Sequence, residues 1–274
     1  MTDSGESNGL ARQIGDLREE GEDLHALLAT LAATDWQRPT TFKGWTVWDV
    51  VAHLHFSDHM GVTTIAGSDA FKALMKDMRD SALSLTAYTR RWLGDLSGPE
   101  LHARWRGLFL ELCERLAAAD PEVRLTWPGP GMKPRMFATA RQMETWAHAW
   151  EIYDLLGTPR THGDRIRNIV EIGVRTFGWS FSNRGLDVPD DPPYLALTAP
   201  SGSLWTYNEP TADSRITGSA VAFCQVVTQV RNVADTELEV SGATARRWMA
   251  IAQCFAGPPE EPPPAGTRAP NMAH

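Results

Sequence analysis

The 274-residue chain has few cysteines and no long apolar segment. The first of these excludes a disulfide-rich protein, and the second excludes a protein with membrane-spanning helices. Cys113, Cys224 and Cys254 lie far apart and form no Cys-x-x-Cys motif, so we predict no disulfide framework and a reducing, cytoplasmic location. No apolar run approaches the ~20 residues that a membrane span needs, and the polar residues 1–9 lack the apolar centre of a signal peptide. We therefore expect no membrane partner.

Positive charge is also scarce. The chain has 26 basic and 34 acidic side chains and a formal net charge of −8, and only four of the basic residues are lysines. Without a surplus of basic residues no surface is suited to phosphates, so the sequence predicts no nucleic-acid partner. The hydrophobic content of 42% and the charged content of 22% are ordinary for a soluble globular protein.

Apolar residues recur at helical spacing through most of the first 184 residues. One of the predicted helices begins at Thr46, a good N-cap that Asp49 follows three residues later, as in a capping box. The other helices of this part are predicted over residues 10–31, 70–91, 99–119, 136–156 and 164–183. Helices of this length and number predict an all-helical bundle.

The composition changes after Arg184, where the Pro- and Asp-rich residues 189–193 form a joint. Beyond it the pattern predicts short strands at 194–199 and 203–207 around a Pro-Ser-Gly turn, then a helix at 219–230, a strand at 237–240 and a helix at 243–255. We predict a mainly α protein, with a helical bundle at 8–184, a small α+β domain at 190–256 and a disordered Pro-rich tail at 257–274.

Glu144 and His148 are the most informative pair in the sequence. They lie four residues apart on a predicted helix, so the carboxylate and the imidazole point from the same face. Two such ligands are half of a divalent-metal site. On a helix surface, however, such pairs commonly form only a weak contact worth ~0.2–0.5 kcal/mol. A metal site therefore needs a further ligand from another helix.

Three histidines on the helix that begins at Thr46 are candidates for that ligand. At about 100° per residue, His53 lies at one edge of the apolar stripe, His55 lies at the other edge, and His59 points largely away from it. His55 and His59 are also four residues apart and form a rival pair. The spacing favours His53 only slightly and leaves the choice open.

Residues 44–54, Gly-Trp-Thr-Val-Trp-Asp-Val-Val-Ala-His-Leu, and residues 141–148, Arg-Gln-Met-Glu-Thr-Trp-Ala-His, resemble the mycothiol-dependent maleylpyruvate isomerase group of the DinB-like (YfiT-like) superfamily. In that superfamily a four-helix bundle holds a divalent metal through one histidine of the second helix and two ligands of a later helix. The resemblance thus implies His53, Glu144 and His148 as metal ligands. Zinc is the default metal for this set, and nickel, iron and manganese also suit it.

The C-terminal part resembles the small sterol-carrier-like α+β domain that follows the bundle in these proteins. The matching segments are residues 195–198, 216–220 and 238–242. Residues 218–257 are most similar to an uncharacterised branch of predicted metal-binding proteins. The resemblance therefore covers roughly residues 10–256, and it implies the fold more firmly than the substrate.

The resemblance implies a divalent-metal-dependent enzyme of the mycothiol-dependent S-transferase or isomerase type. Three protein ligands leave a position at which the metal activates a small thiol, such as mycothiol, or water for attack on an electrophilic carbonyl metabolite or for its isomerisation. Arg141 is a candidate catalytic residue that orients Glu144 or binds an anionic substrate, and Asp58 is a candidate for bonding a ligand histidine. We expect a small-molecule substrate and a monomer or homodimer.

Two other functions remain open from the sequence. One is a thiol-independent, metal-dependent isomerase, cyclase or lyase of primary or secondary metabolism, which needs the same Lewis acid. The other is a non-catalytic protein that binds a metal in the bundle and a hydrophobic ligand in the C-terminal domain. A closed site, with His55 or His59 as a fourth ligand, favours this last function.

Overall fold

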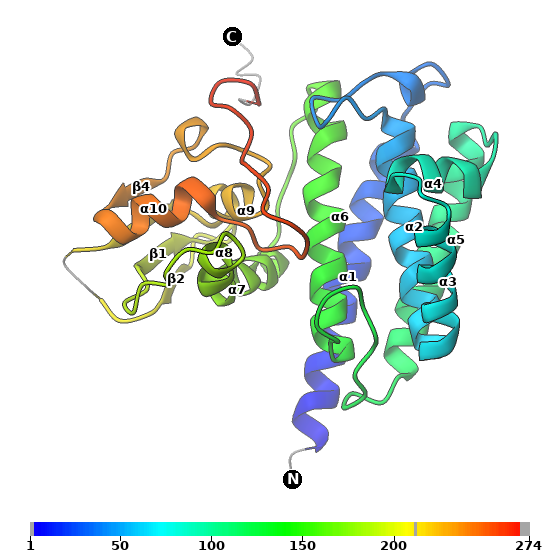
Figure 1. The fold of residues 1–274 in the computed structure, drawn as a ribbon. Coiled ribbons are helices and arrows are strands. Elements are labelled where there is room, and N and C mark those ends of the chain that lie inside the picture. The colour runs from blue at the N-terminus through cyan, green and yellow to red at the C-terminus, as the bar shows by residue number, and fades with distance from the viewer. Residues whose placement is uncertain (1–2, 211–212, 269–274) are drawn as a thin grey trace. The chain divides into compact units, whose positions relative to one another are not determined.

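The computed structural model describes residues 3–210 and 213–268. The chain divides into two compact units, Met1–Leu155 and Leu156–His274. The first unit is helical, and the second combines helices with a four-stranded sheet, which confirms the predicted fold class (Figure 1). In the described ranges, no helix is both long enough and apolar enough to cross a lipid bilayer.

Four long helices form the bundle of the first unit, as the family resemblance implied (Figure 1). They are α1 (Asp3–Leu28), α2 (Val47–Ala66), α5 (Gly98–Ala118) and α6 (Pro134–Leu156). Their inward faces carry fully buried apolar side chains, among them Leu17, Leu24, Val50, Leu54, Leu101, Phe109, Phe137 and Trp146. Removing this apolar surface from water is the main force that holds the four helices together.

A capping box fixes where α2 begins. The Thr46 side chain accepts a hydrogen bond from the backbone N–H of Asp49, and the Asp49 carboxylate accepts one from the backbone N–H of Thr46 at 3.0 Å. Two backbone donors that the helix leaves without a partner are thereby satisfied. The start of α2 sets the direction in which His53, two turns later, projects.

The predicted helix over 70–91 is two helices, α3 (Ser68–Asp80) and α4 (Leu85–Leu93), and the single-helix prediction is wrong. Ala82 has a φ of 53°, in the left-handed region, so the chain turns there. Ser84 then caps a new helix by accepting a hydrogen bond from the backbone N–H of Ala87. This break gives α4 a direction of its own against α2.

The predicted helix over 164–183 is also broken. The structure has a 3-10 turn at Asp164–Ile166, then α7 (Arg167–Arg175) and α8 (Phe177–Ser182). Between α7 and α8, the Thr176 hydroxyl bonds the carbonyls of the preceding turn at 2.8 and 3.0 Å. Both helices pack on the helices of the second unit, whereas the sequence assigned them to the bundle, because an amphipathic pattern does not reveal which core it covers. The predicted domain limits at 184 and 190 stay a prediction.

The sheet of the second unit has the strand order β2-β1-β3-β4. β1 (Tyr194–Thr198) pairs antiparallel with β2 (Leu204–Tyr207), which confirms the predicted hairpin, and parallel with β3 (Arg215–Ser219). β4 (Glu239–Ser241) pairs antiparallel with β3. The helices α9 (Ala220–Val227) and α10 (Ala243–Ile251) supply the buried aromatic side chains Phe223 and Trp248.

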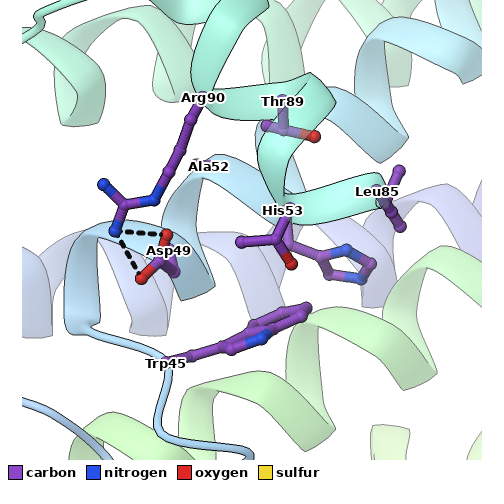
Figure 2. Close-up of a pocket in the computed structure, with 8 residues that line it drawn as sticks. Trp45, Asp49, Ala52, His53, Leu85, Thr89 and Arg90 are labelled. Atoms are coloured by element: carbon purple, nitrogen blue, oxygen red, sulfur yellow. Dashed lines mark hydrogen bonds and ion pairs between the residues drawn. The ribbon is translucent and has the colours of Figure 1, made fainter. Parts of the chain in front are cut away.

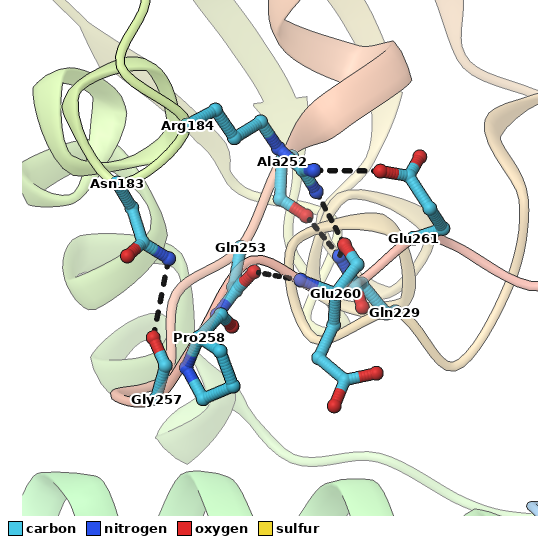
Figure 3. Close-up of polar contacts among 9 residues, drawn as sticks. All are labelled: Asn183, Arg184, Gln229, Ala252, Gln253, Gly257, Pro258, Glu260 and Glu261. Carbon is cyan, nitrogen blue, oxygen red and sulfur yellow. Dashed lines mark hydrogen bonds and ion pairs between the residues drawn. The ribbon is translucent and has the colours of Figure 1, made fainter.

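Residues 257–268 were predicted to be disordered, but the structure describes an extended segment held by hydrogen bonds (Figure 3). Asn183 donates to the carbonyl of Gly257 at 3.2 Å, and Gln229 donates to the carbonyl of Glu260 at 2.8 Å. Arg184 pairs with Glu261 at 2.7 Å. Side chains from distant parts of the unit thus satisfy the polar groups of this Pro-rich segment. Residues 269–274 of the predicted tail lie outside the described residues.

Gly21 and Gly15 of α1 provide a test of the α1–α5 packing. A Cβ atom on Gly21 would lie 2.2 Å from the ring of Phe109, whereas a Cβ atom on Gly15 would meet nothing within 4 Å. We expect Gly21→Ala to lower the free energy of unfolding by about 1–3 kcal/mol, because Phe109 must move. Gly15→Ala should raise it by about 0.5–1 kcal/mol, because alanine is the better helix former. Urea unfolding of both variants measures the difference, and effects of the same sign would contradict the described packing.

Candidate metal centre

His53 of α2 and the pair Glu144 and His148 of α6 come together inside the bundle. The Nε2 atom of His53 lies 3.6 Å from Oε2 of Glu144, and Nε2 of His148 lies 3.5 Å from the same oxygen. One ligand atom of each residue lies within 4.8 Å of the others. Atoms that share one cation at ~2.0–2.2 Å lie roughly 3–4 Å apart, so small side-chain movements suffice to hold a divalent ion.

The protonation states of this group suit a metal. Burial opposes the charge of Glu144, but hydrogen bonds with His148 and His53 outweigh it and hold the pKa of this carboxyl well below its usual range. Burial lowers the pKa of His148 to about 4, although Glu144 acts in the opposite direction. At neutral pH, Glu144 is therefore an anion and His148 a neutral imidazole, the forms that bind metals. The Glu144 side chain is 29% exposed, so the centre is accessible from solvent.

A tight turn before α2 places two aromatic rings beside the candidate ligand histidines. Lys43 and Gly44 both have positive φ angles, 51° and 70°, and the N–H of Trp45 donates to the carbonyl of Phe42 at 2.9 Å. This backbone geometry is that of a two-residue hairpin turn, in which glycine at the second position is favoured. The turn brings Phe42 and Trp45 to the same side of the bundle.

Both aromatic rings contact His148. The ring of Trp45 stacks on that of His148, with centroids 5.9 Å apart and planes 12° from parallel. The rings of Phe42 and His148 form a T-shaped contact with centroids 5.3 Å apart. The Trp45 ring also lies 5.3 Å from that of His53. These contacts restrict the rotation of both imidazoles. Phe42 and Trp45 were not predicted as site residues from the sequence, although the Lys43-Gly44 pair between two aromatic residues is a signal for the turn.

Arg141 and Asp58, the two candidate catalytic residues, bind each other. The Nε atom of Arg141 donates to Oδ1 of Asp58 at 3.0 Å, and Nη2 donates to the carbonyl of Leu54 at 3.4 Å. Both side chains are almost fully enclosed, and burial raises the pKa of Asp58 although Arg141 opposes it. The pair joins α6 to α2. Arg141 lies three residues before Glu144 on α6, and Asp58 lies five residues after His53 on α2. Their role in catalysis stays a prediction, and their geometry is that of groups that position the two helices.

His55 and His59, the rivals of His53, lie elsewhere on α2. Their rings pack against Trp92 at centroid distances of 5.4 and 4.7 Å. Among the described residues, the potential metal-binding group contains His53, Glu144 and His148 and neither of the two other histidines. The structure therefore brings together the three residues that the resemblance implied.

A small cavity adjoins His53 on the side of α4, and it had no counterpart in the sequence analysis (Figure 2). Its wall contains the ion pair of Arg90 with Asp49, at 2.7 Å, and the side chains of Trp45 and Thr89. Sequence reasoning missed this wall because it merged α4 with α3. Only the capping serine, Ser84, signalled that a separate helix begins there.

Removal of one member of the Arg141–Asp58 pair is expected to be costly, whereas removal of both is not. Arg141→Met leaves a buried carboxylate without a partner and should lower the free energy of unfolding by about 3–5 kcal/mol. The double variant Arg141→Met, Asp58→Leu should recover most of this loss, because it removes both charges. As a control, Lys76→Met removes an exposed pair with Asp80 and should change stability by less than about 1 kcal/mol. Urea unfolding measures all three, and a loss in Arg141→Met no greater than in the control contradicts the expectation.

Comparison with known proteins identifies the family. The family model described as mycothiol maleylpyruvate isomerase N-terminal domain matches residues 17–153. Uncharacterized proteins from two strains of Mycobacterium tuberculosis are 38% identical to this chain over 246 residues, which cover 90% of this chain and 96% of each relative.

Two solved structures have the same fold. The crystal structure of the mycothiol-dependent maleylpyruvate isomerase matches with a TM-score of 0.57 at 13% identity and covers 92% of this chain and 96% of its own. A histidine-to-alanine mutant of that enzyme matches with a TM-score of 0.54 at 14% identity, over 79% and 88% of the two chains. Since the family match spans half of the chain and includes all three candidate ligands, this protein belongs to the mycothiol maleylpyruvate isomerase N-terminal domain family, with its DinB-like fold.

Proposed function

We propose that this protein is a divalent-metal-dependent enzyme of the mycothiol-dependent isomerase or S-transferase type, acting in the cytoplasm on an electrophilic carbonyl metabolite. The observation that carries the proposal is the meeting of His53, Glu144 and His148 from two helices within 4.8 Å. Membership of the mycothiol maleylpyruvate isomerase family supports the thiol and the isomerase chemistry. The three cysteines are buried thiols, which agrees with a reducing compartment.

The donor set fits a divalent cation, with zinc as the default and nickel, iron or manganese as alternatives. His53 and His148 present Nε2 atoms and Glu144 presents Oε2. Three protein ligands leave at least one position open to a substrate, a thiol or water. When bound, the cation supplies Lewis acidity, which favours the thiolate over the thiol and polarises a carbonyl group.

The protein residues around the centre hold it in shape. Stacking of Trp45 on His148 and the edge contact of Phe42 fix the ring of one ligand and shield it from water. The pair of Arg141 with Asp58 fixes the two helices that carry all ligands. A rigid set of ligands keeps the open position in one place, so a thiol and a carbonyl substrate meet in a defined geometry.

The ligand set is tested by metal content. We expect His148→Ala to lose the bound metal, because two remaining ligands hold a divalent ion poorly. His59→Ala is the matched control, since His59 packs on Trp92 outside the group and its loss should leave the metal in place. Plasma emission analysis of the purified proteins gives the metal stoichiometry. Undiminished metal in His148→Ala would show that the assignment is wrong.

The thiol is tested separately, by thermal unfolding of the metal-loaded protein. Mycothiol at a hundred times its dissociation constant should stabilise the protein by about 2.7 kcal/mol, whereas cysteine at the same concentration should not. The shift should disappear in His148→Ala. Full metal content without any stabilisation by mycothiol contradicts the thiol and favours the metal-dependent isomerase, cyclase or lyase that works without one.

A further inference from the structure

The cavity beside His53 has room for one water molecule. It lies between α2 and α4, and the residues that line it are Trp45, Asp49, Ala52, His53, Leu85, Thr86, Thr89 and Arg90 (Figure 2). The space open to the centre of a water molecule is about 10 Å³. About 10–15 Å³ of this measure is what a single water needs, and a substrate needs far more.

Three polar atoms of the lining residues are enclosed without a hydrogen bond among the residues that the structure describes. They are Oδ1 of Asp49, Nδ1 of His53 and Oγ1 of Thr89, and of these only Oδ1 of Asp49 has an ion-pair partner, Arg90 at 2.7 Å. Thr89 is only 3% exposed, so bulk solvent does not reach its hydroxyl. Enclosed polar atoms of folded proteins are normally bonded to protein or to ordered water.

The Asp49 carboxylate supplies a third polar group in the same wall. It lies one turn before His53 on α2 and is held from two sides, by the backbone N–H of Thr46 at 3.0 Å and by Arg90 at 2.7 Å. The Arg90 guanidinium is in turn placed over the ring of Trp48, 5.1 Å from its centroid. The pair of Asp49 with Arg90 therefore holds α4, which carries Thr89, against α2 beside His53. An ordered water needs two to four polar partners, and Nδ1 of His53 and the Thr89 hydroxyl supply two.

We propose that Thr89 is a positioning residue of the metal centre, which holds one water molecule that accepts the Nδ1–H of His53. The water then donates to the Thr89 hydroxyl. When the cation is bound, the proton of His53 lies on Nδ1, where this water accepts it, and Nε2 is free to bind the cation. The inference rests on the proposed function in one respect, that His53 is a ligand.

This role predicts how metal affinity depends on α4, a helix that supplies no ligand. Partners that bond the second nitrogen of a ligand histidine fix its tautomer, and their loss typically weakens metal binding 10–100-fold. Thr89→Val keeps the shape of the side chain and removes only the hydroxyl. We expect its dissociation constant for Zn²⁺, measured by competition with a chromophoric chelator, to rise 10–100-fold. Thr89→Ser should bind within a few-fold of the unchanged protein.

Thr145→Val is the matched control. Thr145 is 1% exposed, its hydroxyl also lacks a hydrogen bond among the described residues, and it neighbours Glu144 on α6, but it does not line the cavity. Its loss should leave zinc affinity unchanged. Unchanged affinity in Thr89→Val, or an equal loss in Thr145→Val, overturns the proposal. His148→Ala separates this failure from failure of the proposed function, because it must lose zinc whether or not Thr89 has a role.

A second measurement decides the matter if Thr89→Val does not fold. A crystal structure of the unchanged, zinc-loaded protein at high resolution shows ordered water directly. The proposal requires one ordered water within hydrogen-bond distance of Nδ1 of His53 and of Oγ1 of Thr89. A cavity without this water overturns it. In a folded Thr89→Val the water should be lost, a change that a merely structural role for Thr89 does not produce.

Discussion

The ion pair of Arg141 with Asp58 constrains the whole bundle, because it is enclosed and joins the two helices that carry the candidate ligands. Sliding α6 along α2 by one turn would leave both charges buried without a partner, which is far more costly than the loss of an apolar contact. A buried hydrogen bond from the Gln13 side chain to that of Gln142, at 2.8 Å, links α1 to α6 next to this ion pair. Apolar packing holds the helices together, and these polar contacts select one register among those that packing allows.

Features set by a few neighbouring residues could be predicted from the sequence. The cap of Thr46 and Asp49 fixed the start of α2, and the four-residue spacing placed Glu144 and His148 on one face. The break before α4 was missed, because helical periodicity continues through residues 81–84 and the capping role of Ser84 competes with it. Local patterns thus locate a helix, but they do not show which of two conflicting signals, periodicity or a capping residue, prevails.

Features that depend on a distant partner could not be predicted in this way. Periodicity left His53, His55 and His59 as alternatives. The family resemblance favoured His53, and the position of α6 is what brings His53 to Glu144. Arg141 and Asp58 were recognised as candidates individually, but nothing in the sequence shows that they bind each other across 83 residues. The Pro-rich composition beyond residue 256 suggested disorder, because composition does not reveal amide donors such as Gln229 that satisfy its carbonyls.

Asp49 has three structural duties at once. It completes the cap of α2, it anchors α4 through Arg90, and it lines the cavity beside His53. A substitution at this position therefore removes a helix cap, an interhelical pair and a neighbour of the ligand together. Reduced metal content in an Asp49 variant is a compound phenotype, since it does not reveal which of the three was lost. Variants of Arg90 and Thr89 are therefore the better probes of the residues that line this cavity, because neither removes the cap of α2.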